Sequence, residues 1–176
     1  MKRYLEIGPG PKLHEFGGHP HTVDVLNWKP DSEGAERWGW PLNTDSQRYD
    51  GIFAAHVIEH VPWSRTNVAL SEAFRILKPG GTIELWTPDL AYLVRCYQEA
   101  RCGDSWRRMN RQDDPMRWFL GRLYTYGPGE ENWHHAAFDE PYLTKCLEQA
   151  GFSVVTRLPR RKHRHAASEL GVRAQR

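Results

Sequence analysis

The pentapeptide HVIEH places His56, Glu59 and His60 at the His-x-x-Glu-His spacing of a zinc-hydrolase signature. In that chemistry the two histidines bind the metal and the glutamate acts as a base, which requires all three on one helix. The apolar run 51–55 directly before them predicts a buried strand, and Pro62 disfavours a regular helix after it. A zinc hydrolase is therefore the less favoured interpretation, and we predict no metal ligand.

Two further histidines, His134 and His135, come just before a predicted helix that begins after Asp139. Histidine titrates near neutral pH, so either side chain could take a proton from a substrate hydroxyl. Neighbouring residues on an extended segment point in opposite directions, so only one of the two can face a crevice. Both are candidate catalytic residues. A role in capping the helix or in packing at the rim of the crevice is the alternative.

A glycine-rich turn, Gly8-Pro9-Gly10, follows Glu6 and the first apolar segment of the chain. Glycine lets backbone N–H groups approach a ligand closely, because no Cβ intervenes. A dinucleotide site would continue to a third glycine, but the residue in that place is Leu13, which disfavours NAD. The turn is a candidate ligand site, with a purely structural turn as the alternative.

An acidic residue, Asp24, closes the second predicted strand, 14 residues after Gly10. At that position its carboxylate could accept hydrogen bonds from two ribose hydroxyls, and Val25 and Leu26 could form one wall of an adenine slot. The alternative is an acid at the end of a strand with no ligand.

Strand and helix signals alternate along the chain, which predicts a mainly parallel sheet in an α/β fold. The expected strands cover residues 4–7, 22–25, 51–55, 82–86, 152–158 and 170–174, and the expected helices cover 64–77, 90–101 and 139–150. A faint strand signal lies near residues 36–38. A glycine of the run Lys78-Pro79-Gly80-Gly81 is expected to cap the helix that ends at residue 77. Ligands of such sheets bind beyond the carboxyl ends of the strands, so the turns there should face one crevice.

Length and composition limit the class of protein. A chain of 176 residues with 39% hydrophobic residues predicts a single domain, residues 1–176. A net charge of +2 argues neither for nor against a polyanionic partner, and we expect no nucleic-acid partner. No apolar run is long enough to cross a membrane. Three cysteines without Cys-x-x-Cys spacing favour free thiols in the cytoplasm.

Five ordered stretches carry a resemblance to a known family: YLEIGPGP, VDV, YDGIFAAHVIEHVPW, EAFRILKPGGTIELWTPDL and FDEPYLTKCLEQAGF. Together they resemble class I S-adenosylmethionine-dependent methyltransferases, and most of all the short type-11 group. The resemblance covers nearly the whole chain. It implies a Rossmann-like, doubly wound, three-layer sandwich with a seven-stranded sheet, whose last strand, about 170–174, is antiparallel.

The same resemblance implies a binding site for S-adenosylmethionine and an acceptor site beside it. The implied cofactor-binding residues are Glu6, Gly8, Pro9, Gly10, Asp24, Val25, Leu26, Arg37, Ala55, His56 and Val57. His56 and its neighbours would border the methionine part of the cofactor, so HVIEH is interpreted as a cofactor wall. Segment 102–133, rich in Arg and Trp, matches the place of a helical substrate lid.

We therefore expect a methyltransferase that acts on a small polar acceptor, at oxygen, with His134 as the leading base. A non-catalytic cofactor-binding or partner subunit is the alternative from another class.

Overall fold

The computed structural model describes residues 1–8, 21–26, 41–99, 114–125, 132–161 and 166–176. The described strands are β1 (Lys2–Ile7), β2 (His21–Leu26), β3 (Tyr49–Ala55), β4 (Leu77–Pro88), β5 (Ser153–Arg157) and β6 (Glu169–Gln175). The helices are α1 (Thr66–Ile76), α2 (Leu90–Glu99), α4 (Pro115–Tyr124) and α5 (Glu140–Gln149), with short 3-10 helices η1 (Ile58–His60), η2 (Trp63–Arg65) and η4 (Ala166–Ser168).

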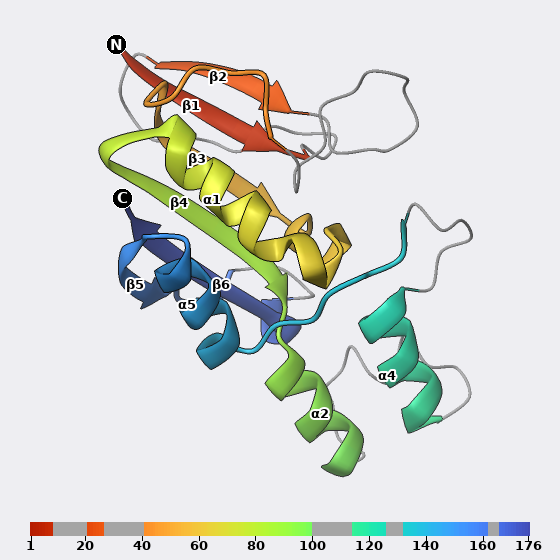
Figure 1. The fold of residues 1–176 in the computed structure, drawn as a ribbon. Coiled ribbons are helices and arrows are strands. Elements are labelled where there is room, and N and C mark those ends of the chain that lie inside the picture. The colour runs from red at the N-terminus through yellow and green to blue at the C-terminus, as the bar shows by residue number, and fades with distance from the viewer. Residues whose placement is uncertain (9–20, 27–40, 100–113, 126–131, 162–165) are drawn as a thin grey trace.

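The six strands form one sheet in the order β2-β1-β3-β4-β6-β5 (Figure 1). Strands β1 to β4 are parallel, whereas β6 runs antiparallel to both β4 and β5, which confirms the expected antiparallel last strand. The mixed α/β, Rossmann-like fold is thus as predicted. The described residues do not establish a seventh strand or a third layer, and the faint strand signal near residues 36–38 lies outside them.

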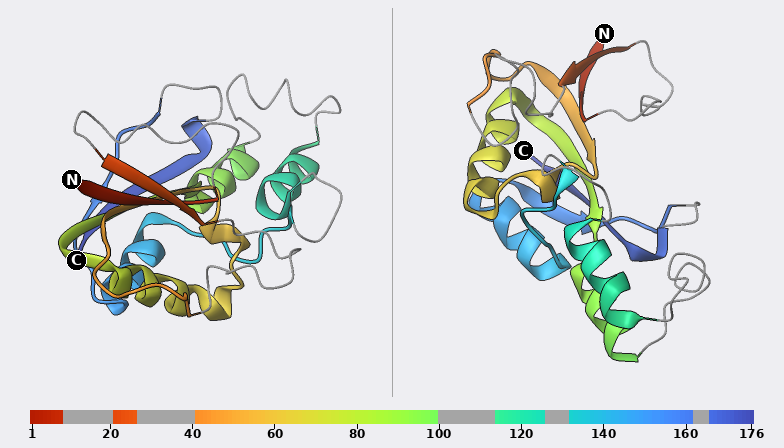
Figure 2. Two further views of the ribbon diagram at one scale, coloured as in Figure 1. Left: turned by 90° about the horizontal axis from the view of Figure 1, so that it is seen from above. Right: turned by 90° about the vertical axis from the view of Figure 1, so that its right-hand side faces the viewer.

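Helices α1 and α5 lie on the same face of the sheet (Figures 1 and 2). Their apolar stripes meet the sheet in one continuous core, in which Leu70, Ile76, Leu143 and Leu147 are fully buried. Asp139 caps α5, since its Oδ1 accepts a hydrogen bond of 2.9 Å from the Tyr142 backbone N–H, as the sequence indicated.

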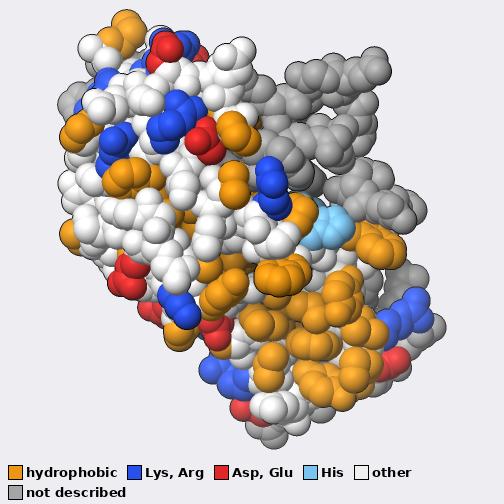
Figure 3. Space-filling model, viewed as in Figure 1, with side chains coloured by type: hydrophobic (Ala, Val, Ile, Leu, Met, Phe, Trp, Pro, Cys, Tyr) orange, Lys and Arg blue, Asp and Glu red, His pale blue; other side chains and the backbone are white. Residues whose placement is uncertain are grey.

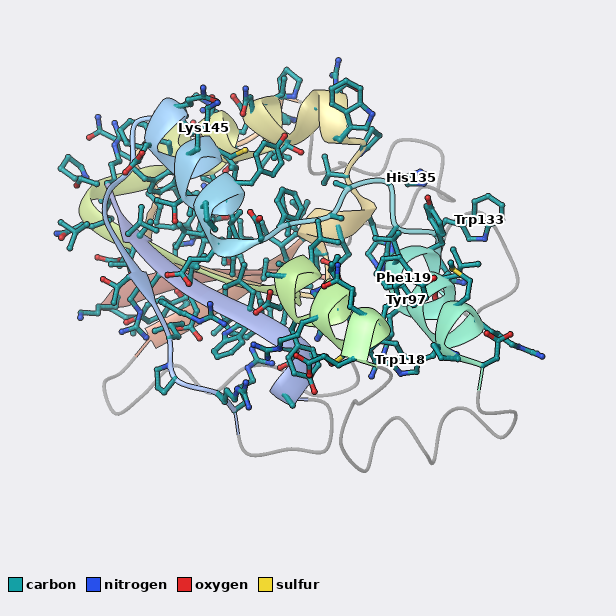
Figure 4. All side chains as sticks on the ribbon, turned by 90° about the horizontal axis from the view of Figure 1, so that it is seen from below. Tyr97, Trp118, Phe119, Trp133, His135 and Lys145 are labelled. Carbon is teal, nitrogen blue, oxygen red and sulfur yellow. The ribbon has the colours of Figure 1, made fainter. Side chains whose placement is uncertain are left out.

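Helices α2 and α4 pack against each other beyond the carboxyl end of β4 (Figure 2). Trp118 of α4 is buried in a small second cluster with Leu93 and Cys96 of α2. Phe119 and Tyr97 add a ring contact with centroids 5.4 Å apart (Figure 4). Apolar side chains gather on the outer face of this helix pair (Figure 3), where Met116, Leu120 and Tyr124 are exposed.

Two expectations from the sequence are wrong. Helix α1 ends at Ile76, and Leu77 is already extended and starts β4, so Gly80, at φ +78°, lies in a bend of the strand and not in a helix cap. Cys96 is disulfide-bonded, whereas Cys146 is the buried free thiol that was expected.

None of the described helices is long and apolar enough to cross a membrane.

Candidate functional site

The carboxyl ends of the central strands meet at one edge of the sheet. Ile7 pairs with both Leu26 and Ala54, and Ala55 pairs with Trp86, so β1 to β4 end side by side. At this edge the chain turns sharply at Gly8 (φ 64°) and at His56 (φ 56°). A left-handed conformation is uncommon for His and sets it apart from ordinary strand residues. The parallel topology thus brings together the strand ends beyond which the selected turns begin.

His56 is held between two buried carboxylates. Its Nε2 lies 2.7 Å from Glu169 Oε1, and its Nδ1 lies 3.2 Å from Glu59 Oε1. Burial alone would lower the pKa of His56, but the hydrogen bonds to Glu169 and Glu59 outweigh it and raise the pKa to about 9. His56 is therefore an imidazolium at neutral pH, a form that neither accepts a proton nor binds a metal.

Glu59 connects this edge to the segment before α5. Its side chain is 1% exposed, and Oε2 accepts a hydrogen bond of 3.2 Å from Thr87 Oγ1. Burial alone would raise the pKa of Glu59, but the hydrogen bond and charge of His56 hold it below its usual value. The backbone oxygen of Glu59 accepts hydrogen bonds from the N–H groups of His135 (2.7 Å) and Ala136 (3.0 Å). These two hydrogen bonds hold the segment that carries His134 next to η1.

His134 is a partly buried imidazole beside His60. The two rings meet edge to face, with centroids 4.8 Å apart. Nδ1 of His134 lies 3.2 Å from the Leu123 carbonyl oxygen, and burial is the main cause that lowers its pKa below 6.5. His135 is exposed on the same segment, between α4 and α5 (Figure 4). Only one of these neighbours therefore faces inward, and it is a neutral imidazole at pH 7.

A cavity of about 160 Å³ opens between this edge and the α2–α4 pair. Its polar walls are His56, Glu169, Ser168, Arg122, Thr125 and His134, and its apolar floor includes Pro88 and Leu93. Drug-sized ligands occupy pockets of about 300–1,000 Å³, so this space suits a small polar group. A second void of about 10 Å³, the size of one water molecule, lies next to it and is lined by Glu59, Thr87 and His134, among others.

The other candidate residues are distributed along the same edge. Glu6 is buried in β1, Leu26 packs on the core at the end of β2, and Val25 is half-exposed. Ala55 closes β3, and Val57 is buried in the core behind His56. Pro9, Gly10 and Arg37 lie outside the described residues.

Asp24 lies two residues before the end of β2 rather than at the turn. Its Oδ2 accepts hydrogen bonds from Arg3 Nε and Tyr49 OH, each of 2.9 Å. The structure thus shows an ion pair within the fold at this acid, and a contact with ribose stays a prediction.

The zinc-hydrolase arrangement is not what the fold produces. HVIEH begins directly after β3 and ends in the 3-10 helix η1, so His56 lies outside the short helix that holds Glu59 and His60. Nearby, Asp89 caps α2, because its Oδ1 accepts a hydrogen bond of 3.1 Å from the Tyr92 backbone N–H. Asp89 is also paired with Arg157 (2.9 Å).

Glu169, Arg122 and Thr87 were missed by sequence reasoning. Glu169 is 113 residues from its partner His56, and no local motif marks it. Thr87 could have been suspected from its place at the end of a predicted strand.

Comparisons with known proteins agree with this architecture. The family model described as a methyltransferase domain matches residues 2–157. A SAM-dependent methyltransferase from Aquifex aeolicus superposes with a TM-score of 0.59 at 16% identity, over 99% of this chain and 81% of that one. One from Methanosarcina mazei gives a TM-score of 0.55 at 16% identity, over 99% and 92%.

A third solved structure, from Thermotoga maritima, is described as a SAM-dependent methyltransferase and possible histamine N-methyltransferase. It gives a TM-score of 0.54 at 18% identity, over 99% of this chain and 82% of that one. No curated protein matches the chain.

Proposed function

The chain belongs to the methyltransferase-domain family and is an S-adenosylmethionine-dependent methyltransferase, and from this premise we propose that it methylates a small polar acceptor at oxygen. The acceptor would occupy the cavity between His56, His134 and Glu169. The observation that carries the proposal is the position of His134, a partly buried neutral imidazole on the wall of that cavity.

The cofactor is proposed to lie along the carboxyl edge of β1, β2 and β3. Gly8 supports this placement, because its positive φ and missing Cβ let a ligand approach the backbone. The proposed contacts to the methionine part are Glu6, Gly8, Pro9, Gly10, Ala55, His56 and Val57, with Asp24 at the ribose and Val25, Leu26 and Arg37 at the adenine side. His56 is proposed as a fixed positive charge in this set, because two carboxylates keep it protonated.

The reaction is an in-line displacement at the methyl carbon. S-adenosylmethionine, when bound, would supply the methyl group, and transfer would replace the sulfur–methyl bond with a bond to the acceptor oxygen and leave S-adenosylhomocysteine with the electron pair. The proton of the acceptor hydroxyl passes to Nε2 of His134, because Nδ1 of that ring is turned to the Leu123 carbonyl. Position and exclusion of water supply the rest of the rate enhancement.

Segment 102–133 is proposed as the lid of a single domain, 1–176. Its described part includes α4, from which Gly121 and Arg122 line the acceptor cavity. Arg122 and Glu169 face the same cavity with opposite charges. An acceptor with both a hydroxyl and a further polar group would suit such walls.

The test is a screen of hydroxyl-bearing and amine-bearing metabolites for formation of S-adenosylhomocysteine, followed by kinetics of His134→Ala on the best acceptor. Loss of the base should lower kcat by about 10²–10⁴-fold. The Kd for S-adenosylhomocysteine should stay close to the wild-type value, because the imidazole would contact the acceptor and not the ribose or adenine. The matched control is His135→Ala, which alters the exposed neighbour and should keep wild-type turnover.

A wild-type kcat for His134→Ala at saturating acceptor would contradict the assignment of the base. Turnover of amines alone would contradict transfer to oxygen.

A further inference from the structure

Three side chains with metal-ligating atoms converge at the rim of the candidate site. Glu59, His60 and His134 each offer one ligand atom, and these atoms all lie within 4.8 Å of one another. Glu59 is buried, and both histidines are partly buried. We propose that Glu59, His60 and His134 form a binding site for a divalent transition-metal cation such as Zn²⁺.

The hydrogen bonds behind the two imidazoles support this site. Nδ1 of His60 lies 3.1 Å from the Trp133 carbonyl oxygen, and Nδ1 of His134 lies 3.2 Å from the Leu123 carbonyl oxygen. A carbonyl oxygen can only accept, so each Nδ1 carries the hydrogen and each Nε2 carries a lone pair. Metal-binding histidines in proteins nearly always have such a partner behind the ring, because it fixes the tautomer and orientation.

The backbone around the cluster is held in place without a metal. His60 follows Glu59 in η1, and the segment that carries His134 is joined to η1 by the two hydrogen bonds from His135 and Ala136 to the Glu59 oxygen. His134 N also donates to the Tyr124 oxygen over 3.2 Å. Two segments that are far apart in sequence are thus fixed side by side, and only side-chain torsions remain to be set.

One ion fits this cluster if the three ligand atoms move closer together. The void of about 10 Å³ is lined by Glu59 and His134, two of the three proposed ligands. A tetrahedral Zn²⁺ lies about 2.1 Å from each ligand, which places ligand atoms about 3.4 Å apart. The side chains would therefore have to draw together by on the order of 1 Å. Two imidazoles and one carboxylate leave a coordination position open and favour Zn²⁺ over Mg²⁺ or Ca²⁺.

The proposed site, Glu59, His60 and His134, is not the zinc site that the His-x-x-Glu-His spacing of HVIEH indicates. His56 is excluded, because its two ring nitrogens are engaged with Glu59 and Glu169. His134, which lies 74 residues after His60, takes its place.

The first test uses full-length protein, dialysed against a chelator, and titrates it with CoCl₂ while ligand-field absorption is recorded. Calorimetric titration with ZnCl₂ follows. We expect one bound ion per chain with the spectrum of a low-coordinate nitrogen–oxygen site. His60→Ala should lower the affinity by about 100-fold or more, and Glu59→Gln should have a similar effect.

The matched control is His135→Ala, which removes an exposed histidine next to the cluster and should bind both metals as the wild type does. If circular dichroism shows that His60→Ala does not fold, His60→Gln takes its place. Absence of stoichiometric binding would overturn the proposal. Equal affinity in the wild type and the His60 variant would also overturn it, because the ion would then bind elsewhere.

A consequence of the site rests on the proposed function. The metal and a proton would compete for the same lone pair of His134, so ZnCl₂ should inhibit methyl transfer, and a chelator should restore it. Binding is measured without cofactor or acceptor, so failure of the metal site and failure of the base assignment give separate results. Stoichiometric Zn²⁺ binding with unchanged turnover would leave the metal site intact and contradict His134 as the base.

Discussion

Replacing Asp24 with Asn separates the structural role of this acid from its proposed contact with ribose. Oδ2 of Asp24 accepts hydrogen bonds of 2.9 Å from Arg3 Nε and from Tyr49 OH, and Arg3 Nη2 lies 2.7 Å away. Arg48 Nε is more distant, at 3.6 Å. These contacts connect β1, β2 and the start of β3, so they support the edge of the sheet on which the proposed cofactor site depends.

The loss of stability follows from these contacts and their exposure. The side chains of Asp24 and Arg3 are 31% and 38% exposed, so water screens their ion pair, and such pairs contribute about 0.2–1 kcal/mol. The hydrogen bond from Tyr49 is weakened as well, because the neutral amide oxygen of Asn replaces a carboxylate acceptor, and charge-assisted hydrogen bonds are about twice as strong as neutral ones. Asp24→Asn should therefore lower the free energy of unfolding at pH 7 by about 1–2 kcal/mol.

The difference should depend on pH in one direction. Burial alone would raise the pKa of Asp24, but the hydrogen bonds from Tyr49 and Arg3 and the charges of Arg3 and Arg48 hold it below 3.8. A carboxyl with a lowered folded pKa adds stability that is present above its unfolded pKa and is lost as the pH falls through the folded one. The free energies of unfolding of the wild type and Asp24→Asn should thus differ fully at pH 7. They should converge as the pH falls below about 4.

Urea unfolding followed by circular dichroism measures this difference at each pH. Tyr49→Phe is the matched control, because it removes one hydrogen bond and keeps the carboxylate. Calorimetry with S-adenosylhomocysteine then separates the roles. A ribose contact predicts that only Asp24→Asn weakens binding, by about 1–3 kcal/mol. Equal stability of Asp24→Asn and wild type at pH 7, or a difference that persists in acid, would refute the reasoning about the ion pair.

Two further substitutions test the fold around the site. A Cβ on Gly171 of β6 would lie under 3.0 Å from the Trp86 ring in β4, so Gly171→Ala should lower the free energy of unfolding by about 1–3 kcal/mol. An unchanged urea midpoint would show that β4 and β6 do not pack as described. Asp139→Ala should lower the free energy of unfolding by about 1 kcal/mol, because α5 loses its N-terminal cap. A melting temperature equal to that of the wild type would argue against the cap.

Local patterns in the sequence were sufficient to predict much of the sheet. Each of the six expected strands lies within or close to an observed one. Short apolar runs bounded by Gly, Pro or polar residues are too short for a helix and therefore indicate buried strands. The end of α1 was missed for a physical reason. Leu77 matches the apolar stripe of the helix. In the structure it instead pairs with Tyr49 of β3 and is the first residue of β4.

The candidate site was only partly readable from the sequence. The position of HVIEH after β3 follows from local pattern. The same kind of pattern predicts that His134 and His135 point in opposite directions, but not which of the two faces inward. His56 lies between Glu59 and Glu169 because β6 pairs antiparallel with β4 and so brings Glu169 to this edge. The residues around position 56 do not predict that long-range contact. The disulfide of Cys96 likewise could not be inferred, because odd, widely spaced cysteines do not reveal their pairing.

An isotope-filtered nuclear Overhauser measurement tests most directly whether the cofactor presents its methyl group to the cavity at the carboxyl edge. The protein is mixed with S-adenosylmethionine whose methyl group carries the isotope label, and no acceptor is needed. We expect contacts from the labelled methyl group to the ring protons of His134 and His56, which line the cavity. Contacts confined to residues at the amino ends of the strands, such as Lys2 or His21, or no binding at all, would contradict the proposed site.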